Sequence, residues 1–330
     1  MRLATSRLWL LGGLSLTLLL LFVEHRIHAA EADLISQPGA SFIVPPHDIP
    51  TQWTIIAYGD TRFTNPQNVT ATNPKVRRWL VDKIAEEHPD ALLISGDLPY
   101  NGANTSDYEV FRSETAPWRA ASLRVYPALG NHELNGGELF GLRNWWAEFP
   151  TLNHRRWYSV QFGNVYIIAL DSDTDLTPGT RQQLWLADQI AHLPAETQFV
   201  MIELHHPPVA DTVVPQLHLV RTNESALAIY LNSIAPKLRA RLIVIAGHIH
   251  NYERFQQGSI TYLVDGGGGA KPYPVTRDPE DMYKNPPAVN YNYIRFHFDG
   301  TQVAATMYRV DPDKNSPSWE ARDSFIIPAP

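Results

Sequence analysis

The sequence predicts a layered α/β or α+β domain whose functional groups lie at the ends of strands. Short apolar runs typical of strands alternate with segments whose apolar residues recur at helical spacing. Several of the apolar runs end directly in a polar motif, and the carboxyl ends of strands are where open α/β sheets place their sites. The 330 residues are enough to bury a core, and no internal repeat at solenoid periods is visible.

The N-terminal segment differs in kind from the rest of the chain. Arg2 and Arg7 precede a sixteen-residue apolar run at residues 8–23, and small residues follow from Ala29 onward. This order is typical of a secretory signal peptide over residues 1–30, which predicts an exported protein, periplasmic or secreted, of bacterial type. An uncleaved N-terminal membrane anchor is the alternative, because the apolar run is only slightly short for a span.

The remaining chain shows the alternation in order. Residues 31–52 contain several prolines and predict an irregular lead-in to one catalytic domain over 53–330. Apolar runs predict strands at residues 54–58, 91–95, 124–129, 158–162, 165–170, 198–204, 242–246, 260–265, 291–299 and 302–309. Helical spacing predicts helices at residues 74–87, 108–119, 181–193 and 225–235.

Composition excludes several classes of function. The net charge is −7 and no long basic run follows the first residues, so no stable nucleic-acid partner is expected. Cysteine is absent, which excludes disulfides, thiolate ligands and a cysteine nucleophile. Any metal site must therefore use oxygen atoms and imidazole nitrogens.

Five predicted strands end in motifs that carry such atoms. The motifs are Gly59-Asp60, Gly96-Asp97, Gly130-Asn131-His132-Glu133, His205-His206-Pro207-Pro208 and Gly247-His248-Ile249-His250. Carboxylates, one amide oxygen and imidazoles suit Zn²⁺, Mn²⁺ or iron. Seven of these side chains are too many for one tetrahedral ion but suit two ions if one carboxylate bridges them; the seven are Asp60, Asp97, Asn131, His205, His206, His248 and His250. Two adjacent ions can clamp the attacking and leaving oxygens of a phosphoryl displacement.

In this order the motifs resemble the signature of the calcineurin-like metallophosphoesterase superfamily, over about residues 54–270. Asp60-Thr61-Arg62 lacks the histidine of the usual Asp-x-His motif, and Tyr100 stands three residues after Asp97. This departure resembles the purple acid phosphatases, in which a tyrosinate replaces that histidine on iron. A hard phenolate oxygen suits Fe³⁺. The resemblance implies a four-layer αββα sandwich of two mixed β-sheets flanked by helices, with Fe³⁺ beside Fe²⁺, Zn²⁺ or Mn²⁺.

The resemblance also assigns roles to residues. It implies that the first metal is held by Asp60, Asp97, Tyr100 and His250. It implies that the second metal is held by Asp97, Asn131, His205 and His248, with Asp97 as the bridge. His132 is then the acid that protonates the leaving oxygen or steadies the phosphate. Glu133 is expected to orient His132.

Three assignments have alternatives. His206 is either the second-metal ligand in place of His205, or a group near the phosphate, or merely a neighbour of the ligand. Arg62 is either a phosphate-binding group or a surface charge. Tyr100 is either a metal ligand or a core-edge residue with its hydroxyl in water.

The predicted reaction is hydrolysis of a small phosphomonoester by metal-bound hydroxide. A phosphodiesterase acting at the same site is the nearest alternative, because loops at residues 133–157 and 209–224 are expected to select the substrate. A non-catalytic exported metal- or phosphate-binding protein is the alternative from another class. No membrane contact is expected of the mature form unless the leader is retained, and the sequence does not indicate the oligomeric state.

Overall fold

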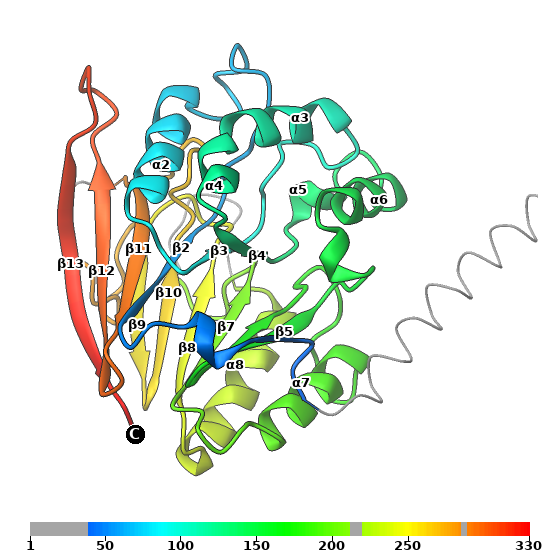
Figure 1. The fold of residues 1–330 in the computed structure, drawn as a ribbon, viewed down its shortest axis with the longest axis vertical. Coiled ribbons are helices and arrows are strands. Elements are labelled where there is room, and N and C mark those ends of the chain that lie inside the picture. Colours follow the sequence, from blue (N-terminus) through cyan, green and yellow to red (C-terminus); the bar gives the residue numbers. More distant parts are fainter. Residues whose placement is uncertain (1–38, 212–219, 285–288) are drawn as a thin grey trace, which may run out of the picture. The chain divides into compact units, whose positions relative to one another are not determined.

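Two β-sheets face each other in the computed structural model, which describes residues 39–211, 220–284 and 289–330 (Figure 1). The seven-stranded sheet runs in the order β1 (Phe42–Val44), β5 (Tyr158–Phe162), β6 (Val165–Ala169), β7 (Phe199–Leu204), β8 (Arg241–Ala246), β10 (Ile260–Val264) and β9 (Glu253–Gln257). The six-stranded sheet runs in the order β13 (Trp319–Pro328), β12 (Gln302–Val310), β11 (Tyr291–Phe298), β2 (Trp53–Tyr58), β3 (Ala91–Ile94) and β4 (Arg124–Pro127). Both sheets are mixed.

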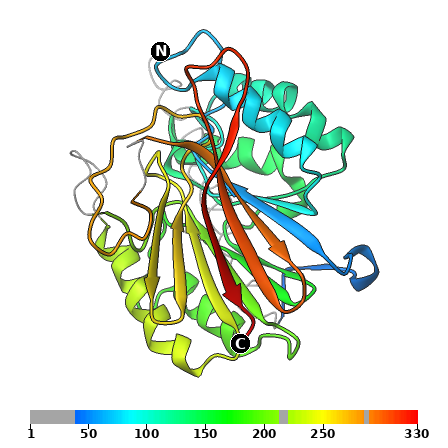
Figure 2. The ribbon, with the colours of Figure 1, turned by 90° about the vertical axis from the view of Figure 1, so that its left-hand side faces the viewer.

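Helices cover the outer faces of the two sheets (Figures 1 and 2). The six-stranded sheet is covered by α2 (Pro74–Glu86), α3 (Thr105–Glu114) and α4 (Ala116–Ala120). The seven-stranded sheet is covered by α7 (Arg181–Ala191) and α8 (Thr222–Ile234). Shorter connections contain α5 (Asn131–Leu134), α6 (Glu138–Glu148) and the 3₁₀ turns η1 (Pro46–Asp48), η2 (Pro150–Leu152) and η3 (Ala235–Lys237). The predicted four-layer αββα sandwich is therefore confirmed.

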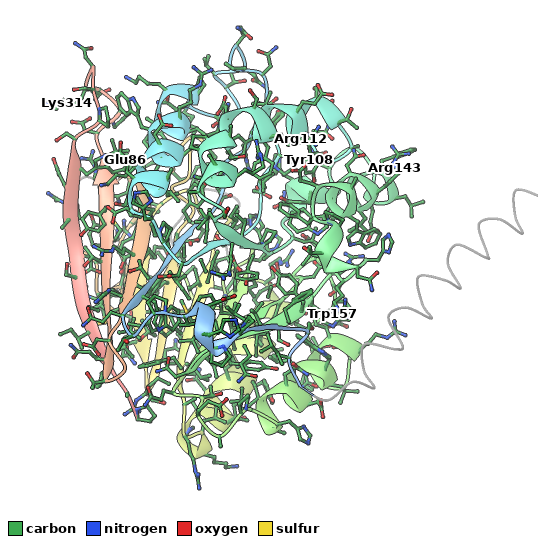
Figure 3. All side chains as sticks on the ribbon, in the orientation of Figure 1. Glu86, Tyr108, Arg112, Arg143, Trp157 and Lys314 are labelled. Carbon is green, nitrogen blue, oxygen red and sulfur yellow. The ribbon has the colours of Figure 1, made fainter. Side chains whose placement is uncertain are left out.

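Buried apolar clusters join the four layers. Ile55, Met201 and Ile243 belong to the cluster between the sheets, while Ile56 faces α2 and Ile168 faces the opposite helices. The central strands are buried on both faces, which explains why their sequences read as continuous apolar runs. Figure 3 shows the contrast between the buried Tyr108 and Trp157 and the exposed Glu86, Arg143 and Lys314.

The strand directions place the predicted motifs at shared edges. Strands β2, β3 and β4 are parallel neighbours, with Tyr58 paired to Ile94 and Ile94 paired to Pro127. Strands β6, β7 and β8 are parallel neighbours in the other sheet, with Leu204 paired to Ala246. The polar residues that follow these strands therefore emerge together at the carboxyl ends.

Several predicted elements differ from the structure. The irregular lead-in at 31–52 was wrong for Phe42–Val44, which forms β1 at a sheet edge before Pro45 and Pro46. Prolines are tolerated next to an edge strand because no further ladder hydrogen bond is needed there. The predicted helix at 108–119 is two helices, because Pro117 lies at the start of α4 and cannot donate to the preceding turn.

The N-terminal predictions lie outside the described residues. This holds for the signal peptide at 1–30, for residues 31–38, and for residues 212–219 of the second substrate-selecting loop. Contacts divide the chain into Met1–Gly39 and Ala40–Pro330. Among the residues described, no helix is long and apolar enough to cross a membrane.

Arg77 joins α2 to α3 and to the segment that follows β2. It is fully buried, and its Nε and Nη2 lie 2.8 and 2.6 Å from the carboxylate oxygens of Glu114. Its Nη1 donates to the carbonyl of Arg62. We expect Arg77→Ala to lower the free energy of unfolding by about 3–5 kcal/mol, because it leaves the Glu114 carboxylate, which is 9% exposed, with only the longer contact to the exposed Arg78. Urea denaturation measures the change.

Arg78 supplies a matched control for this prediction. Its side chain is 57% exposed and its Nε lies 3.6 Å from the same carboxylate. Arg78→Ala should change the free energy of unfolding by less than about 1 kcal/mol, as exposed ion pairs do. Equal losses from the two variants would contradict the structural role assigned to Arg77.

Candidate metal centre

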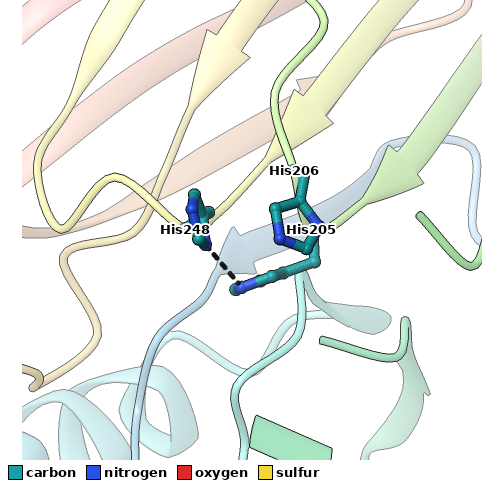
Figure 4. A group of neighbouring side chains, drawn as sticks. All are labelled: His205, His206 and His248. Atoms are coloured by element: carbon teal, nitrogen blue, oxygen red, sulfur yellow. Dashed lines mark hydrogen bonds between the residues drawn. The ribbon is translucent and has the colours of Figure 1, made fainter. Parts of the chain in front are cut away.

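The strand ends bring the predicted ligands together around two foci. The residues that follow β2, β3, β4, β7 and β8 are Asp60, Asp97, Asn131, His205, His248 and His250. At one focus, His205 Nε2 lies 3.1 Å from Asn131 Oδ1 and 3.3 Å from Asp97 Oδ1. The same nitrogen lies 3.2 Å from His248 Nδ1, the contact drawn in Figure 4. Four predicted ligands of the second metal thus converge.

At the other focus, His250 Nε2 lies 3.2 Å from Asp60 Oδ1. Asp60, Asp97 and His205 each offer one ligand atom, and these three atoms lie within 4.8 Å of one another. The two foci are therefore neighbours, with Asp97 near both.

The backbone at these positions is strained. Asp60, Asp97 and His248 have φ values of 57°, 54° and 69°, and Arg62 has 47°. Non-glycine residues in this left-handed region cost about 1–2 kcal/mol each, and such strain gathers at functional sites. Hydrogen bonds between the segments after β2 and β3 hold this strained backbone in place, since Asp60 N donates to Gly96 O and Arg62 N donates to Asp97 O.

Hydrogen bonds to carbonyls fix the tautomers of two of the predicted ligand histidines. His205 Nδ1 lies 2.9 Å from the Ser95 carbonyl, and His250 Nδ1 lies 2.7 Å from the Lys271 carbonyl. A carbonyl oxygen only accepts, so each Nδ1 carries the ring proton and donates it. In the neutral rings each Nε2 therefore presents a lone pair to the surrounding oxygen atoms.

This arrangement fits a metal ion. Asp60 Oδ1 and His250 Nε2 are buried, face each other and have no hydrogen-bond partner among the described residues. Two buried acceptors without a donor are unfavourable, and a cation between them removes that cost. Burial raises the pKa of Asp60 to about 7, with His205 opposing and the Asp97 charge adding to the shift. Oxygen and imidazole donors suit Zn²⁺, Mn²⁺ or iron.

The surroundings of Asp97, which lies near both foci, keep its carboxyl group ionised. Burial alone raises the pKa of the Asp97 carboxyl, but His205, His132 and Arg62 outweigh burial and hold that pKa well below its usual range. Arg62 Nη2 lies 3.2 Å from Asp97 Oδ2, and His132 N donates to Asp97 Oδ1 over 2.9 Å. Arg62 has a side chain only 17% exposed, so the surface-charge alternative was wrong.

Glu133 holds backbone groups rather than the His132 ring. Its carboxylate accepts the N–H groups of Asp97, Leu98 and Gly130. The expectation that Glu133 orients His132 was therefore wrong, because three backbone donors already occupy the carboxylate.

The His132 ring is held by Tyr100 instead. His132 Nδ1 lies 2.5 Å from the Tyr100 carbonyl, and its Nε2 lies 3.8 Å from Asp97 Oδ2. Burial lowers the pKa of His132, while the Asp97 charge opposes the shift. The rings of Tyr100 and His132 lie 5.5 Å apart. The role of the Tyr100 hydroxyl as a ligand stays a prediction.

Two residues near the site were missed in the sequence. Tyr273 stacks on His250 at 4.4 Å between ring centres, and Ser172 Oγ lies 2.8 Å from His206 Nδ1. Ser172 had a usable signal, because it follows strand β6 in the way that the predicted ligands follow their strands. Tyr273 follows the glycine run 266–269, and no spacing rule marks it.

Comparisons with known proteins agree with this geometry. The family model for the calcineurin-like phosphoesterases matches residues 54–252. A phosphoenolpyruvate phosphatase of Allium cepa is 26% identical over 210 residues, which cover 58% of this chain and 41% of that protein. A probable cyclic nucleotide phosphodiesterase of Ruthia magnifica subsp. Calyptogena magnifica is 26% identical over 207 residues, which cover 62% of this chain and 81% of that protein.

The solved structures show the same fold. The purple acid phosphatase PPD1 of yellow lupin (Lupinus luteus) matches with a TM-score of 0.67 at 15% identity, over 85% of this chain and 54% of that chain. The match spans less than half of the length of the onion phosphatase. The family model covers more than half of this chain and includes all five motifs up to His250. The predicted resemblance is thus confirmed, and the chain belongs to the calcineurin-like phosphoesterase family.

Proposed function

We propose that this chain hydrolyses small phosphomonoesters with a dinuclear metal centre. The observation that carries the proposal is the pair of buried, unpartnered lone-pair atoms at Asp60 Oδ1 and His250 Nε2, next to a second convergence of acceptors at His205. Family membership and the phosphatase name of the onion relative support the same reaction.

The chain's own groups divide the work around the metals. Asp60, Tyr100 and His250 are proposed to hold one ion, Asn131, His205 and His248 the other, and Asp97 both. When bound, the ions lower the pKa of water and neutralise phosphate charge. Arg62 binds an equatorial phosphate oxygen with the N–H groups that Asp97 leaves free. His132, when protonated, donates its Nε2 proton to the leaving oxygen.

The metal pair is proposed to be Fe³⁺ with Fe²⁺, Zn²⁺ or Mn²⁺, because the phenol oxygen of Tyr100 is a hard donor of the kind that suits Fe³⁺. A tyrosinate on Fe³⁺ gives a visible charge-transfer colour. We expect Tyr100→Phe to abolish the visible absorption band of the iron-loaded protein. Tyr273→Phe is the matched control, since this ring packs flat on His250 and should leave the band in place. If only Tyr273→Phe lost the band, Tyr273 would be the ligand of the iron and Tyr100 would not.

A phosphodiesterase is the second candidate. It is supported by the relative from Ruthia magnifica, whose name is probable cyclic nucleotide phosphodiesterase and of which 81% is covered. Steady-state hydrolysis of p-nitrophenyl phosphate and bis-p-nitrophenyl phosphate decides between the two. The proposal predicts a higher kcat/KM for the monoester. A higher value for the diester would replace it with the second candidate, and turnover of neither ester would favour the non-catalytic binding protein.

We also propose that the protein is exported. The support is the order of residue types in residues 1–30, where basic residues come first, an apolar run follows, and small residues come last. Cell fractionation with a C-terminal epitope tag tests this, because the proposal places the tag in the periplasm or medium. A membrane-bound full-length form would instead support the uncleaved anchor.

A further inference from the structure

The ring of His206 is fixed by one hydroxyl group. Ser172 Oγ lies 2.8 Å from His206 Nδ1 and accepts the backbone N–H of His206 over 3.0 Å. Both residues are buried. One ring nitrogen from each of His205, His206 and His248 lies within 4.8 Å of the others, so the three imidazoles share the second focus (Figure 4).

Counting protons around Ser172 Oγ gives the direction of this hydrogen bond. A serine hydroxyl has one proton to donate and two lone pairs. The His206 backbone N–H takes one lone pair, and the other hydrogen-bond partner of the oxygen at this ring is His206 Nδ1, 2.8 Å away. The hydroxyl proton therefore points to Nδ1, because a buried O–H is expected to find an acceptor. Nδ1 accepts, and the ring proton of neutral His206 is on Nε2.

The same reasoning gives the opposite tautomer for the ligand histidines. His205 and His250 donate from Nδ1 to carbonyls and keep a lone pair on Nε2. A metal needs that lone pair. In His206 one nitrogen accepts the serine proton and the other carries a proton, so neither is free to bind a metal.

We propose that Ser172 is a positioning residue that holds His206 in the Nε2–H tautomer, so that His206 donates a hydrogen bond to an oxygen of the bound phosphate ester and is not a metal ligand. This rests on the proposed function for the identity of the acceptor, while the tautomer stands on the contacts alone. A neutral donor needs no protonation step, in contrast to His132, whose Nδ1 is occupied by a carbonyl.

The segment that carries Ser172 is fixed from several sides. Arg221 Nη2 lies 2.5 Å from the Ser172 carbonyl and 2.6 Å from Glu224 Oε1. Asp171 N donates to Gln182 Oε1, and Asp171 Oδ2 lies 2.5 Å from Arg156 Nε. A hydroxyl anchored in this way keeps the donor of His206 aligned without reordering when substrate binds.

Nitrogen NMR tests the tautomer directly. The protein is loaded with Zn²⁺, which is diamagnetic, and the long-range proton–nitrogen correlations of its histidines are recorded. His206 is assigned with a His206→Gln variant. We expect a neutral Nε2–H pattern for His206 and a change in its Nε2–H proton shift when inorganic phosphate is added. An Nδ1–H pattern with Nε2 bound to Zn²⁺ would overturn the proposal.

Kinetics tests the role of Ser172. We expect Ser172→Ala to lower kcat/KM about 10- to 100-fold, the usual effect of removing a hydrogen bond that orients a functional histidine. The two-metal content should stay unchanged, and the tautomer pattern of His206 should be lost. Ser172→Thr keeps the hydroxyl and should restore both the pattern and most of the activity.

Thr177→Val is the matched control on the segment after β6, because its hydroxyl donates to the exposed Asp175 carboxylate and not to a histidine. It should keep the wild-type kcat/KM. If Ser172→Ala is well folded by thermal unfolding and retains both the pattern and the activity, the positioning role is wrong. If wild-type protein hydrolyses no ester, the proposed function fails, while the NMR spectrum still decides the tautomer.

Discussion

Asp97→Asn is expected to remove turnover and the two-metal occupancy together. The side chain keeps its shape and can still accept His132 N–H, so the fold should survive. The bridging anion is lost, however, and Arg62, which lies 3.2 Å from Asp97 Oδ2, then adds an uncompensated positive charge to the site. If the two ions stabilise the transition state by about 4 kcal/mol, their loss lowers kcat/KM about a thousandfold. Metal analysis and ester hydrolysis measure both quantities.

The control for this variant lies at the opposite end of the same strand, β3. Asp90 precedes β3 and accepts the backbone N–H of Thr54, at the amino end far from the motifs. Asp90→Asn should keep metal content and kcat/KM, although it weakens one strand-end hydrogen bond. Full metal content and activity in Asp97→Asn would show that Asp97 does not bridge.

His205→Ala is expected to lose one of the two metal ions and about a thousandfold in kcat/KM. His205 Nε2 is the atom on which Asn131, Asp97 and His248 converge, so its removal opens one focus and leaves His250 with Asp60 at the other. A second-site ion supplies several kcal/mol of charge stabilisation. Metal content per chain, measured by mass spectrometry of the purified protein, separates one ion from two.

His47→Ala provides the matched control, because the His47 side chain is 82% exposed and distant in sequence from the five motifs. It should bind two ions and turn over at the wild-type rate. If His205→Ala still binds two ions, His205 is not a required ligand of the second ion. His206 would then be the next residue to substitute.

The positions of the motifs in the candidate site could be predicted from the sequence because the strands before them have uninterrupted apolar sequences. Strands β2, β3, β7 and β8 are buried on both faces and read as uninterrupted apolar runs, so the polar residues after them stand out. The edge strands β9 and β13 gave no such signal. Only one residue of β13 is buried, and β9 ends in Gln256 and Gln257, so neither strand was predicted. α6 falls within 133–157, which we expected to be a loop.

The contacts within the site could not be predicted in the same way. Nothing in the spacing of Ser172 and His206, 34 residues apart, indicates that one hydroxyl faces one ring nitrogen. Likewise, the glutamate of Gly-Asn-His-Glu was expected at His132, whereas it accepts three backbone N–H groups beneath Asp97. These outcomes depend on how strand-end segments cross one another, which only the fold determines.

Metal removal and return tests the central claim most directly. The purified protein is assayed with p-nitrophenyl phosphate before chelation, after chelation, and after addition of iron, zinc or manganese, with metal content measured at each step. The account predicts two ions per chain, loss of hydrolysis with the metals, and recovery when they are restored. Unchanged hydrolysis by metal-free protein, or two bound ions without hydrolysis of either a monoester or a diester, would contradict it.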